Sequence, residues 1–231
     1  MKRIGLVGGI GPASTIAYYR GLIQESLARE TPPRYPEIII DSVDMRRHDA
    51  FLAGRDYDAL ADSLLESLSR LKAAGAEIAA ITANAEHAAW SRIACRLPLP
   101  TVSIVSAAAK AMKRRHIRNV LVFGTEFTLR SALYEKALAP YGITAMTPSQ
   151  EDIPILGRLI YPNLENGIII PDDQAQILAM AKRCINACHP DALLLACTEL
   201  ALAVRQEDVP IPLMDTTQIH IKAIYQEASL P

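Results

Sequence analysis

The chain has 231 residues, enough for one large domain or two of ordinary size, and 50% of them are hydrophobic. Its 24 basic and 25 acidic side chains nearly cancel, so no overall positive field would recruit nucleic acid or an anionic membrane. No apolar run approaches the roughly 20 residues of a spanning helix, and the opening segment lacks the pattern of a signal peptide. Four cysteines without metal-ligand or small-disulfide spacing predict a reduced, cytoplasmic protein.

A glycine-rich turn follows the first predicted strand. Residues 2–7 form a buried strand, and apolar spacing predicts a helix over residues 15–29. Between them, the backbone amides at Gly9 and Gly11 could hold a carboxylate or a phosphate. The pattern is a poor dinucleotide fingerprint, because Ser14 stands where the third glycine should be.

The second predicted strand, residues 37–43, runs into a charged loop at residues 44–48. Arg46 or Arg47 in this loop could offer a cation to an anionic substrate, although a solvated loop is an equally good interpretation. Periodicity and capping then predict, in order, a helix at 56–74, a strand at 77–84, the start of a helix at 85–90, a strand at 101–105 and a helix at 107–115.

The pattern begins again at residue 117. A strand at 117–124 matches the first strand, residues 191–200 match 77–87, and residues 209–216 match 97–103. Gly8 lies 75 residues before Ala83, and Gly124 lies 73 before Cys197, which indicates an internal duplication. We therefore predict an α/β fold of two similar lobes. Each has a central, mainly parallel sheet flanked by helices, and a pseudo-twofold axis relates them. The predicted lobes are residues 1–104 with 215–231, and residues 105–214, with the active site in the cleft between them.

Cys197 ends an unbroken apolar run, residues 192–196, that is typical of a strand buried on both faces. Ligands of open α/β sheets lie at the carboxyl ends of such strands. A helix from residue 201 onward would lower the pKa of this thiol below its usual value of roughly 8.5. The alternative is a small buried hydrophobe. Cys184, Cys188 and His189 could share a helix face as metal ligands, but no second ligand pair accompanies them, so we predict no metal.

Several short motifs resemble those of the aspartate/glutamate racemase family. They are residues 5–12 with Ser14 and Thr15, residues 42–44, Asn84 with His87, Gly124 with Thr125 and Thr128, residues 197–199, and residues 215–217. Cys-Thr-Glu at a strand end with Asp-Thr about 18 residues later is fairly specific to that family. The resemblance implies an isomerase that needs no pyridoxal phosphate or other cofactor, a small amino acid or dicarboxylic acid as substrate, and a homodimer. The wider superfamily includes hydantoin racemases, maleate isomerases and arylmalonate decarboxylases.

The resemblance also implies roles for individual residues. Two cysteines flank the substrate's α-carbon in the two-base members, and one removes a proton while the other returns one. Cys197 matches one of them. The binding shell would consist of the side chains of Asn84, Thr125, Thr128 and Thr198, with backbone amides at Gly9, Gly11 and Ala85. His87 and Glu199 could orient a thiol or serve only as structural hydrogen-bonding groups.

The position of the other cysteine is occupied by Ala83, which can neither give nor take a proton. Thr82 is adjacent, but successive strand side chains point to opposite faces, and a hydroxyl is a weaker acid than a thiol. Glu86 could replace the missing base or recognise an amino group, or it could simply complement the dipole of the helix that follows. Three hypotheses remain: a racemase with an altered second base, a one-thiol isomerase or decarboxylase, and a catalytically inert small-molecule binder. We favour the racemase, with Cys197 as its essential acid and base.

Overall fold

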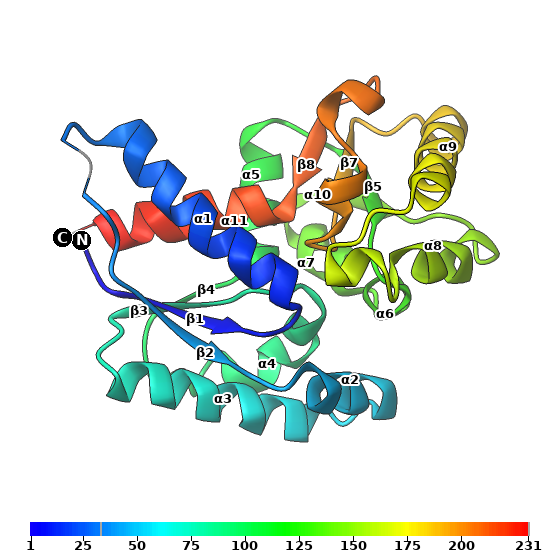
Figure 1. The fold of residues 1–231 in the computed structure, drawn as a ribbon. Helices are drawn as coiled ribbons and strands as arrows, with labels where there is room; N and C mark the ends of the chain where they lie inside the picture. Colours follow the sequence, from blue (N-terminus) through cyan, green and yellow to red (C-terminus); the bar gives the residue numbers. More distant parts are fainter. Residues whose placement is uncertain (33, 231) are drawn as a thin grey trace. The chain divides into compact units, whose positions relative to one another are not determined.

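The computed structural model describes residues 1–32 and 34–230, and the chain divides into two compact units. Unit 1 comprises Met1–Ala107 and Thr217–Pro231, and unit 2 comprises Ala108–Thr216. Each unit is built on a four-stranded parallel sheet flanked by helices (Figure 1). The predicted α/β class, with a parallel sheet in each half, is confirmed. Among the described residues, no helix is both long enough and apolar enough to cross a membrane.

The sheet of unit 1 has the strand order β2-β1-β3-β4. Its strands are β1 (Ile4–Gly8), β2 (Ile38–Ser42), β3 (Ile78–Ile81) and β4 (Thr101–Val102). The helical segments are α1 (Pro12–Arg29), α2 (Met45–Gly54), α3 (Tyr57–Ala73), η1 (Ala85–Ala89), α4 (Trp90–Ile93) and most of α11 (Thr216–Ser229). Helix α5 (Ile104–Arg114) begins in unit 1 and continues into unit 2.

The core of unit 1 lies where α1 and α11 cover one face of the sheet. Ile4 and Leu6 of β1 pack there against Tyr18 of α1 and Ile221 of α11, all fully buried. A Cβ atom on Gly21 of α1 would lie 2.6 Å from the terminal Cδ1 atom of Ile221, so α1 and α11 approach closely here and a larger residue would displace that side chain. Helix α3 contacts β1 through Leu71, which lies against Gly5 on the opposite face of the sheet. Helices on both faces thus bury all five residues of β1.

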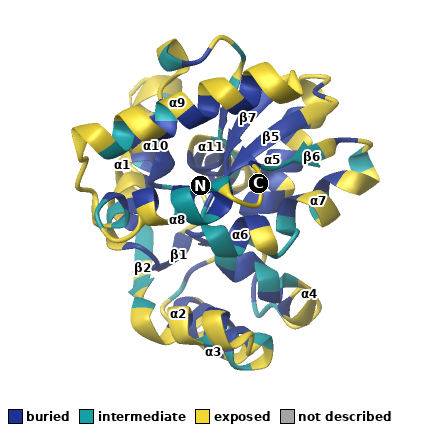
Figure 2. Ribbon diagram, turned by 90° about the vertical axis from the view of Figure 1, so that its right-hand side faces the viewer, coloured by how far each residue is buried: buried dark blue, intermediate teal, exposed yellow. Residues whose placement is uncertain are grey.

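Unit 2 repeats the design with the strand order β6-β5-β7-β8. Its strands are β5 (Asn119–Phe123), β6 (Thr144–Met146), β7 (Ala192–Leu195) and β8 (Leu213–Asp215). Its helical segments are α6 (Glu126–Arg130), α7 (Leu133–Leu138), η2 (Ala139–Tyr141), α8 (Asp152–Ile160), η3 (Leu164–Asn166), α9 (Pro171–Cys188), α10 (Leu200–Ala203) and η4 (Gln206–Asp208). Strands β5 and β7 are buried, and α9 is exposed along its outer side (Figure 2).

The two sheets match in register as well as in strand order. The register pairs Val7 of β1 with Ile81 of β3, and Phe123 of β5 with Leu195 of β7. One residue later, the Thr82 amide donates to the Val7 carbonyl (3.0 Å), as the Ala196 amide does to the Phe123 carbonyl (2.6 Å). Ala83 and Cys197 are therefore equivalent positions of the two sheets. This agreement supports the predicted internal duplication.

Two segments differ from the elements predicted for them. Residues 44–48 are not a loop, because the Asp44 side chain accepts a hydrogen bond from the Arg46 amide (3.0 Å) and caps helix α2. The fourth strand ends at Val102 rather than at residue 105. Ser103 then starts α5 with its backbone carbonyl and its hydroxyl, which accept from the amides of Ala107 and Ser106. Both predictions were wrong because a capping side chain, Asp44 in a charged run and Ser103 in an apolar run, starts a helix there.

Candidate functional site

The turn after β1 is a tight, internally bonded loop. Gly9 has φ +83°, and a Cβ atom there would lie 2.4 Å from the Val43 carbonyl oxygen, so only glycine fits. The Gly9 amide donates to the Thr15 hydroxyl (2.9 Å), and the hydroxyls of Ser14 and Thr15 donate to the Gly11 carbonyl. The amide of Gly9 is thus engaged within the turn. Of the two amides predicted to hold a substrate carboxylate, Gly11 is the better candidate.

At the end of β3, polar side chains bond to the backbone. The Thr82 hydroxyl donates to the Val7 carbonyl (2.9 Å), and the residue is fully buried. His87 is also buried, with its Nδ1 atom 3.0 Å from the Ala83 carbonyl and its ring stacked on Trp90. Burial lowers the pKa of His87 to about 4, so its imidazole is neutral at pH 7. His87 therefore fixes the backbone at Ala83.

Glu86 lies against helix α2. Its carboxylate is buried, and Oε1 is 3.9 Å from Nδ1 of His48, whose Nε2 atom is 3.2 Å from the Ser63 hydroxyl. Burial, with a smaller effect of the neighbouring Arg47, lowers the pKa of His48 to about 4. This buried group connects η1 with α2 and α3. Glu86 thus lies against His48 within unit 1, a contact that its sequence position alone does not indicate.

The two arginines predicted to meet an anionic substrate lie on the first turn of α2, not on a loop. Both Arg46 and Arg47 are exposed. The guanidinium of Arg47 lies over the Phe51 ring, 5.5 Å from its centroid. Ala83, Asn84 and half-buried Ala85 follow β3 directly, as predicted, and the side chain of Asn84 is buried.

Cys197 follows β7 and lies in a cluster of polar side chains. Its Sγ atom donates to Oε2 of Glu199 (3.3 Å), and the Thr198 hydroxyl donates to the same oxygen (2.7 Å). Glu199 is buried, and its Oε1 atom has no hydrogen-bond partner among residues 1–32 and 34–230. The structure thus brings together three residues that the sequence singled out.

The predicted fall in the pKa of Cys197 is wrong. Burial, followed by the negative charge of Glu199, raises the pKa of this thiol well above its usual value. Burial also raises the pKa of Glu199 itself. The helix that was expected to favour the thiolate, α10, has only four residues, and its field does not outweigh the loss of solvent around a buried sulfur. Cys197 is therefore a neutral thiol in this structure.

Thr125 and Thr128 follow β5, Thr125 as the N-cap residue of helix α6 and Thr128 within that helix. The Thr125 hydroxyl caps the helix by accepting from the Thr128 amide (3.3 Å), and the two hydroxyls lie 3.0 Å apart. Thr128 is buried and Thr125 is half-buried, so Thr125 is the one more accessible to a ligand. Gly124 lies just before them. A Cβ atom added to this glycine would lie 3.2 Å from the Ala196 carbonyl oxygen. The ends of β5 and β7 are therefore adjacent.

The three residues of unit 2 that could share a helix face as metal ligands differ in their exposure and backbone conformation. Cys184 is buried and Cys188 is exposed on α9, while His189 ends that helix in a left-handed conformation. Across the described part of the chain, no group of three or more histidine, cysteine or acidic residues could hold a metal ion.

Glu165 of η3 was not singled out from the sequence, although its charge adds to the rise in the pKa of Cys197. Nothing in the local sequence marks it.

Comparison with known proteins gives consistent results. The model of the Asp/Glu/Hydantoin racemase family matches residues 7–224. The broad specificity amino-acid racemase RacX of Bacillus subtilis is 24% identical over 222 residues, which cover 93% of this chain and 92% of that protein. Two crystal structures cover the whole of both chains. They are PH1733, an aspartate racemase homologue from Pyrococcus horikoshii (30% identity, TM-score 0.86), and a putative Asp/Glu racemase from Yersinia pestis (31%, 0.89).

Proposed function

This chain belongs to the Asp/Glu/hydantoin racemase family, and we propose that it is a cofactor-independent amino-acid racemase whose Cys197 exchanges the proton on the substrate's α-carbon. The relatives named above are amino-acid racemases or homologues of them. The observation that carries the proposal is the contact between the Cys197 thiol and the Glu199 carboxylate at the end of β7. A thiol with a proton acceptor 3.3 Å away can change its protonation state during a catalytic cycle.

Proton transfer in this site is proposed to begin at the Cys197–Glu199 contact. Glu199 takes the thiol proton, and the resulting thiolate removes the proton from the α-carbon. The electron pair of the broken C–H bond moves into the substrate carboxylate. A proton from solvent water then adds to the opposite face and inverts the centre, and the proton held by Cys197 and Glu199 is released to solvent. The raised pKa of Cys197 suits this step, because a buried thiolate of high pKa is a stronger base than a solvated one.

The binding groups are proposed to stabilise the negative charge that develops on the substrate carboxylate. Asn84 and Thr125 offer an amide and a hydroxyl directly after β3 and β5, and the backbone amides at Gly11 and Ala85 lie in the turns that follow β1 and β3. Thr128 positions Thr125, since their hydroxyls are 3.0 Å apart. Thr198 positions Glu199, to which its hydroxyl donates.

The second base is the weak point of a racemase mechanism. Ala83, which occupies in unit 1 the position that Cys197 occupies in unit 2, cannot carry a proton. The Thr82 hydroxyl is engaged with Val7, and Glu86 lies against His48. The neutral thiol of Cys197 therefore favours a second candidate function: a one-thiol isomerase or decarboxylase, in which the thiol protonates a carbanion formed without its help. A catalytically inert binder of small molecules is the third hypothesis. The cytoplasmic location and the homodimer stay predictions.

Exchange of the α-proton with solvent deuterium separates these functions. L- and D-amino acids are incubated with the protein in D₂O, and both the deuterium content and the chirality of the product are measured. Exchange with inversion supports the racemase, exchange with retention supports one-thiol chemistry, and binding without exchange supports the inert binder.

The matched variants are Cys197→Ser and Cys95→Ser. We expect Cys197→Ser to slow exchange by about 10³-fold, because a hydroxyl is a far weaker acid than a thiol. Cys95 is exposed on the surface, so Cys95→Ser should leave the rate unchanged. Full activity of Cys197→Ser would overturn both catalytic proposals.

A further inference from the structure

The peptide bond between Leu195 and Ala196, one residue before Cys197, is held at both of its polar atoms. The Ala196 amide donates to the Phe123 carbonyl (2.6 Å) on the β5 side of the strand. The Leu195 carbonyl accepts a hydrogen bond from the Thr216 hydroxyl (2.7 Å), which follows β8 on the other side. Because a peptide group is planar, hydrogen bonds at its two ends fix the orientation of the chain just before the thiol.

Tyr134 of α7 in turn holds the Thr216 hydroxyl. The two side chains are hydrogen-bonded, and both residues are buried. A hydroxyl has one proton to donate and the Leu195 carbonyl can only accept, so the Thr216 oxygen accepts its second hydrogen bond from the Tyr134 hydroxyl. Tyr134, Thr216 and the Leu195 carbonyl therefore form a chain of hydrogen bonds that ends on β7.

The strand registers identify the residue of unit 1 that is equivalent to Thr216. Ala80 of β3 pairs with Val102 of β4, and Leu194 of β7 pairs with Met214 of β8. Ala80 and Leu194 each lie three residues before the equivalent strand ends at positions 83 and 197. Val102 and Met214 are therefore equivalent, and so are the residues two places after them.

The residue two places after Val102 is Ile104, the counterpart of Thr216. Each is the first residue of the helix that follows its strand, α5 and α11, and each is fully buried. Isoleucine has no side-chain donor, so the strand end at Ala83 is formed without a hydrogen bond from this position. The fold therefore does not require a hydroxyl here, and the unit that has one is the unit that carries the thiol.

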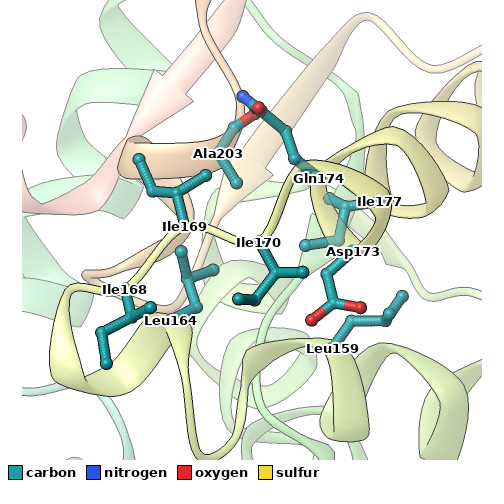
Figure 3. Close-up of a pocket in the computed structure, with 9 residues that line it drawn as sticks. All are labelled: Leu159, Leu164, Ile168, Ile169, Ile170, Asp173, Gln174, Ile177 and Ala203. Atoms are coloured by element: carbon teal, nitrogen blue, oxygen red, sulfur yellow. Dashed lines mark hydrogen bonds between the residues drawn. The ribbon is translucent and has the colours of Figure 1, made fainter.

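The chain after Cys197 is anchored further along. Helix α10 ends at Ala203, whose carbonyl accepts a hydrogen bond from the side-chain amide of Gln174 on α9 (3.0 Å). Figure 3 shows Gln174 and Ala203 at a small pocket whose other walls are mainly leucine and isoleucine side chains. Ala203 lies six residues after the thiol and Leu195 only two before it, so the Thr216 bond has the greater influence on the position of the thiol.

We propose that Thr216 is a positioning residue for Cys197, and that Tyr134 acts through Thr216. Displacement of the thiol by about 1 Å from the α-carbon of a bound substrate can slow proton transfer about 10²-fold. A strand end that carries an acid or base therefore needs closer control than one that carries Ala83. This inference rests on the proposed function, because it takes Cys197 to be the group that exchanges the α-proton.

Thr216→Val tests the inference, since valine keeps the shape of threonine and removes its hydroxyl. We expect kcat for α-deuterium exchange, per folded protein, to fall about 10- to 100-fold while KM changes by less than about 3-fold. Thr216→Ser keeps a hydroxyl and should restore kcat to within about 3-fold of the original value. Tyr134→Phe leaves the bond to Leu195 in place and should lower kcat by only about 2- to 5-fold.

A second measurement reports on the thiol without turnover. In NMR of ¹³C-labelled cysteine, the Cys197 signal should shift in Thr216→Val and return in Thr216→Ser. The matched control is Thr101→Val in unit 1, which removes a hydroxyl that donates to the Leu99 carbonyl (3.0 Å). This variant should change neither the Cys197 signal nor kcat.

The outcomes separate this inference from the proposed function. An unchanged Cys197 signal in Thr216→Val overturns the inference, whether or not the protein turns over amino acids. A shifted signal with unchanged kcat also overturns it, because the hydrogen bond would then have only a structural role. If the original protein exchanges no amino acid, the proposed function is overturned, and a shifted signal still supports placement of the thiol by Thr216.

Discussion

The ends of β3 and β7 have the same backbone and opposite chemistry. Each strand pairs in the same register with the first strand of its unit, and each continues with an equivalent amide-to-carbonyl bond. At the end of β7, Cys197 and Thr198 both donate to a buried carboxylate. At the end of β3 stands Ala83, and His87 bonds to the backbone instead. The hydrogen bonds of the sheet constrain the backbone but not the identity of the residue that follows it, so one repeat can lose a reactive side chain while the fold stays intact.

At the amino ends of their strands, by contrast, the two sheets carry the same kind of residue. Glu77, just before β3, accepts a hydrogen bond from the Arg3 amide (2.9 Å), and Asp191, just before β7, accepts from the Asn119 amide (2.8 Å). Two acidic residues thus make the same structural bond at the amino ends of the two sheets. The units differ in chemistry at the carboxyl ends, which is where ligands of parallel sheets bind.

Ala83→Cys tests this contrast most directly. A thiol in unit 1 at the position equivalent to Cys197 would supply the second acid or base that inversion requires. We expect racemisation, measured by the chirality of the product, to rise by about 10²-fold or more. Ala88→Cys, a half-buried position of η1, is the control for the mere addition of a thiol. An unchanged rate in Ala83→Cys would show that the reaction is not limited by the missing thiol at position 83.

Glu199→Gln tests the polar cluster that only unit 2 has. Loss of the proton acceptor should slow α-proton exchange by about 10- to 100-fold. Because the negative charge of Glu199 raises the pKa of Cys197, its removal should also lower that pKa, which NMR of ¹³C-labelled cysteine measures. Glu165→Gln should lower the pKa of the thiol by less, since the charge of Glu165 has the smaller effect on it. A pKa that rises in Glu199→Gln would contradict the assigned geometry.

The sequence predicted what depends on periodicity and spacing. Apolar runs and matching intervals predicted the repeated βαβ pattern, and the positions of Ala83 and Cys197 at equivalent strand ends follow from the same intervals. The protonation state of Cys197 was predicted with the wrong sign, because it depends on burial and on a carboxylate two residues away that turns back onto the sulfur. The contact between Glu86 and His48 could not be predicted either. It joins residues 38 positions apart whose meeting depends on how η1 packs against α2.

The last contrast between the units concerns acid stability. Unit 1 buries three histidines, His48, His87 and His220, and burial lowers their pKa values to about 4, about 4 and about 3. Their pKa in the unfolded chain is about 6.5, so below that pH the unfolded state binds protons that the folded unit does not. Unit 1 should therefore lose stability as the pH falls from about 6.5 towards 4. Each of these histidines should lower the free energy of unfolding by about 1.4 kcal/mol for every further drop of one in pH across that range.

Unit 2 has no equivalent, since its described histidines, His116 and His189, are exposed. Hydrogen exchange at pH 7 and pH 5 should show amides of β1 and β3 losing protection before those of β5 and β7. His48→Gln removes one buried imidazole and should reduce the difference, whereas His116→Asn, at an exposed position with positive φ, should not. Equal losses in the two units would mean that the buried histidines do not set the acid limit. The difference between the units would then be confined to the strand ends, and both units would lose stability equally as the pH falls.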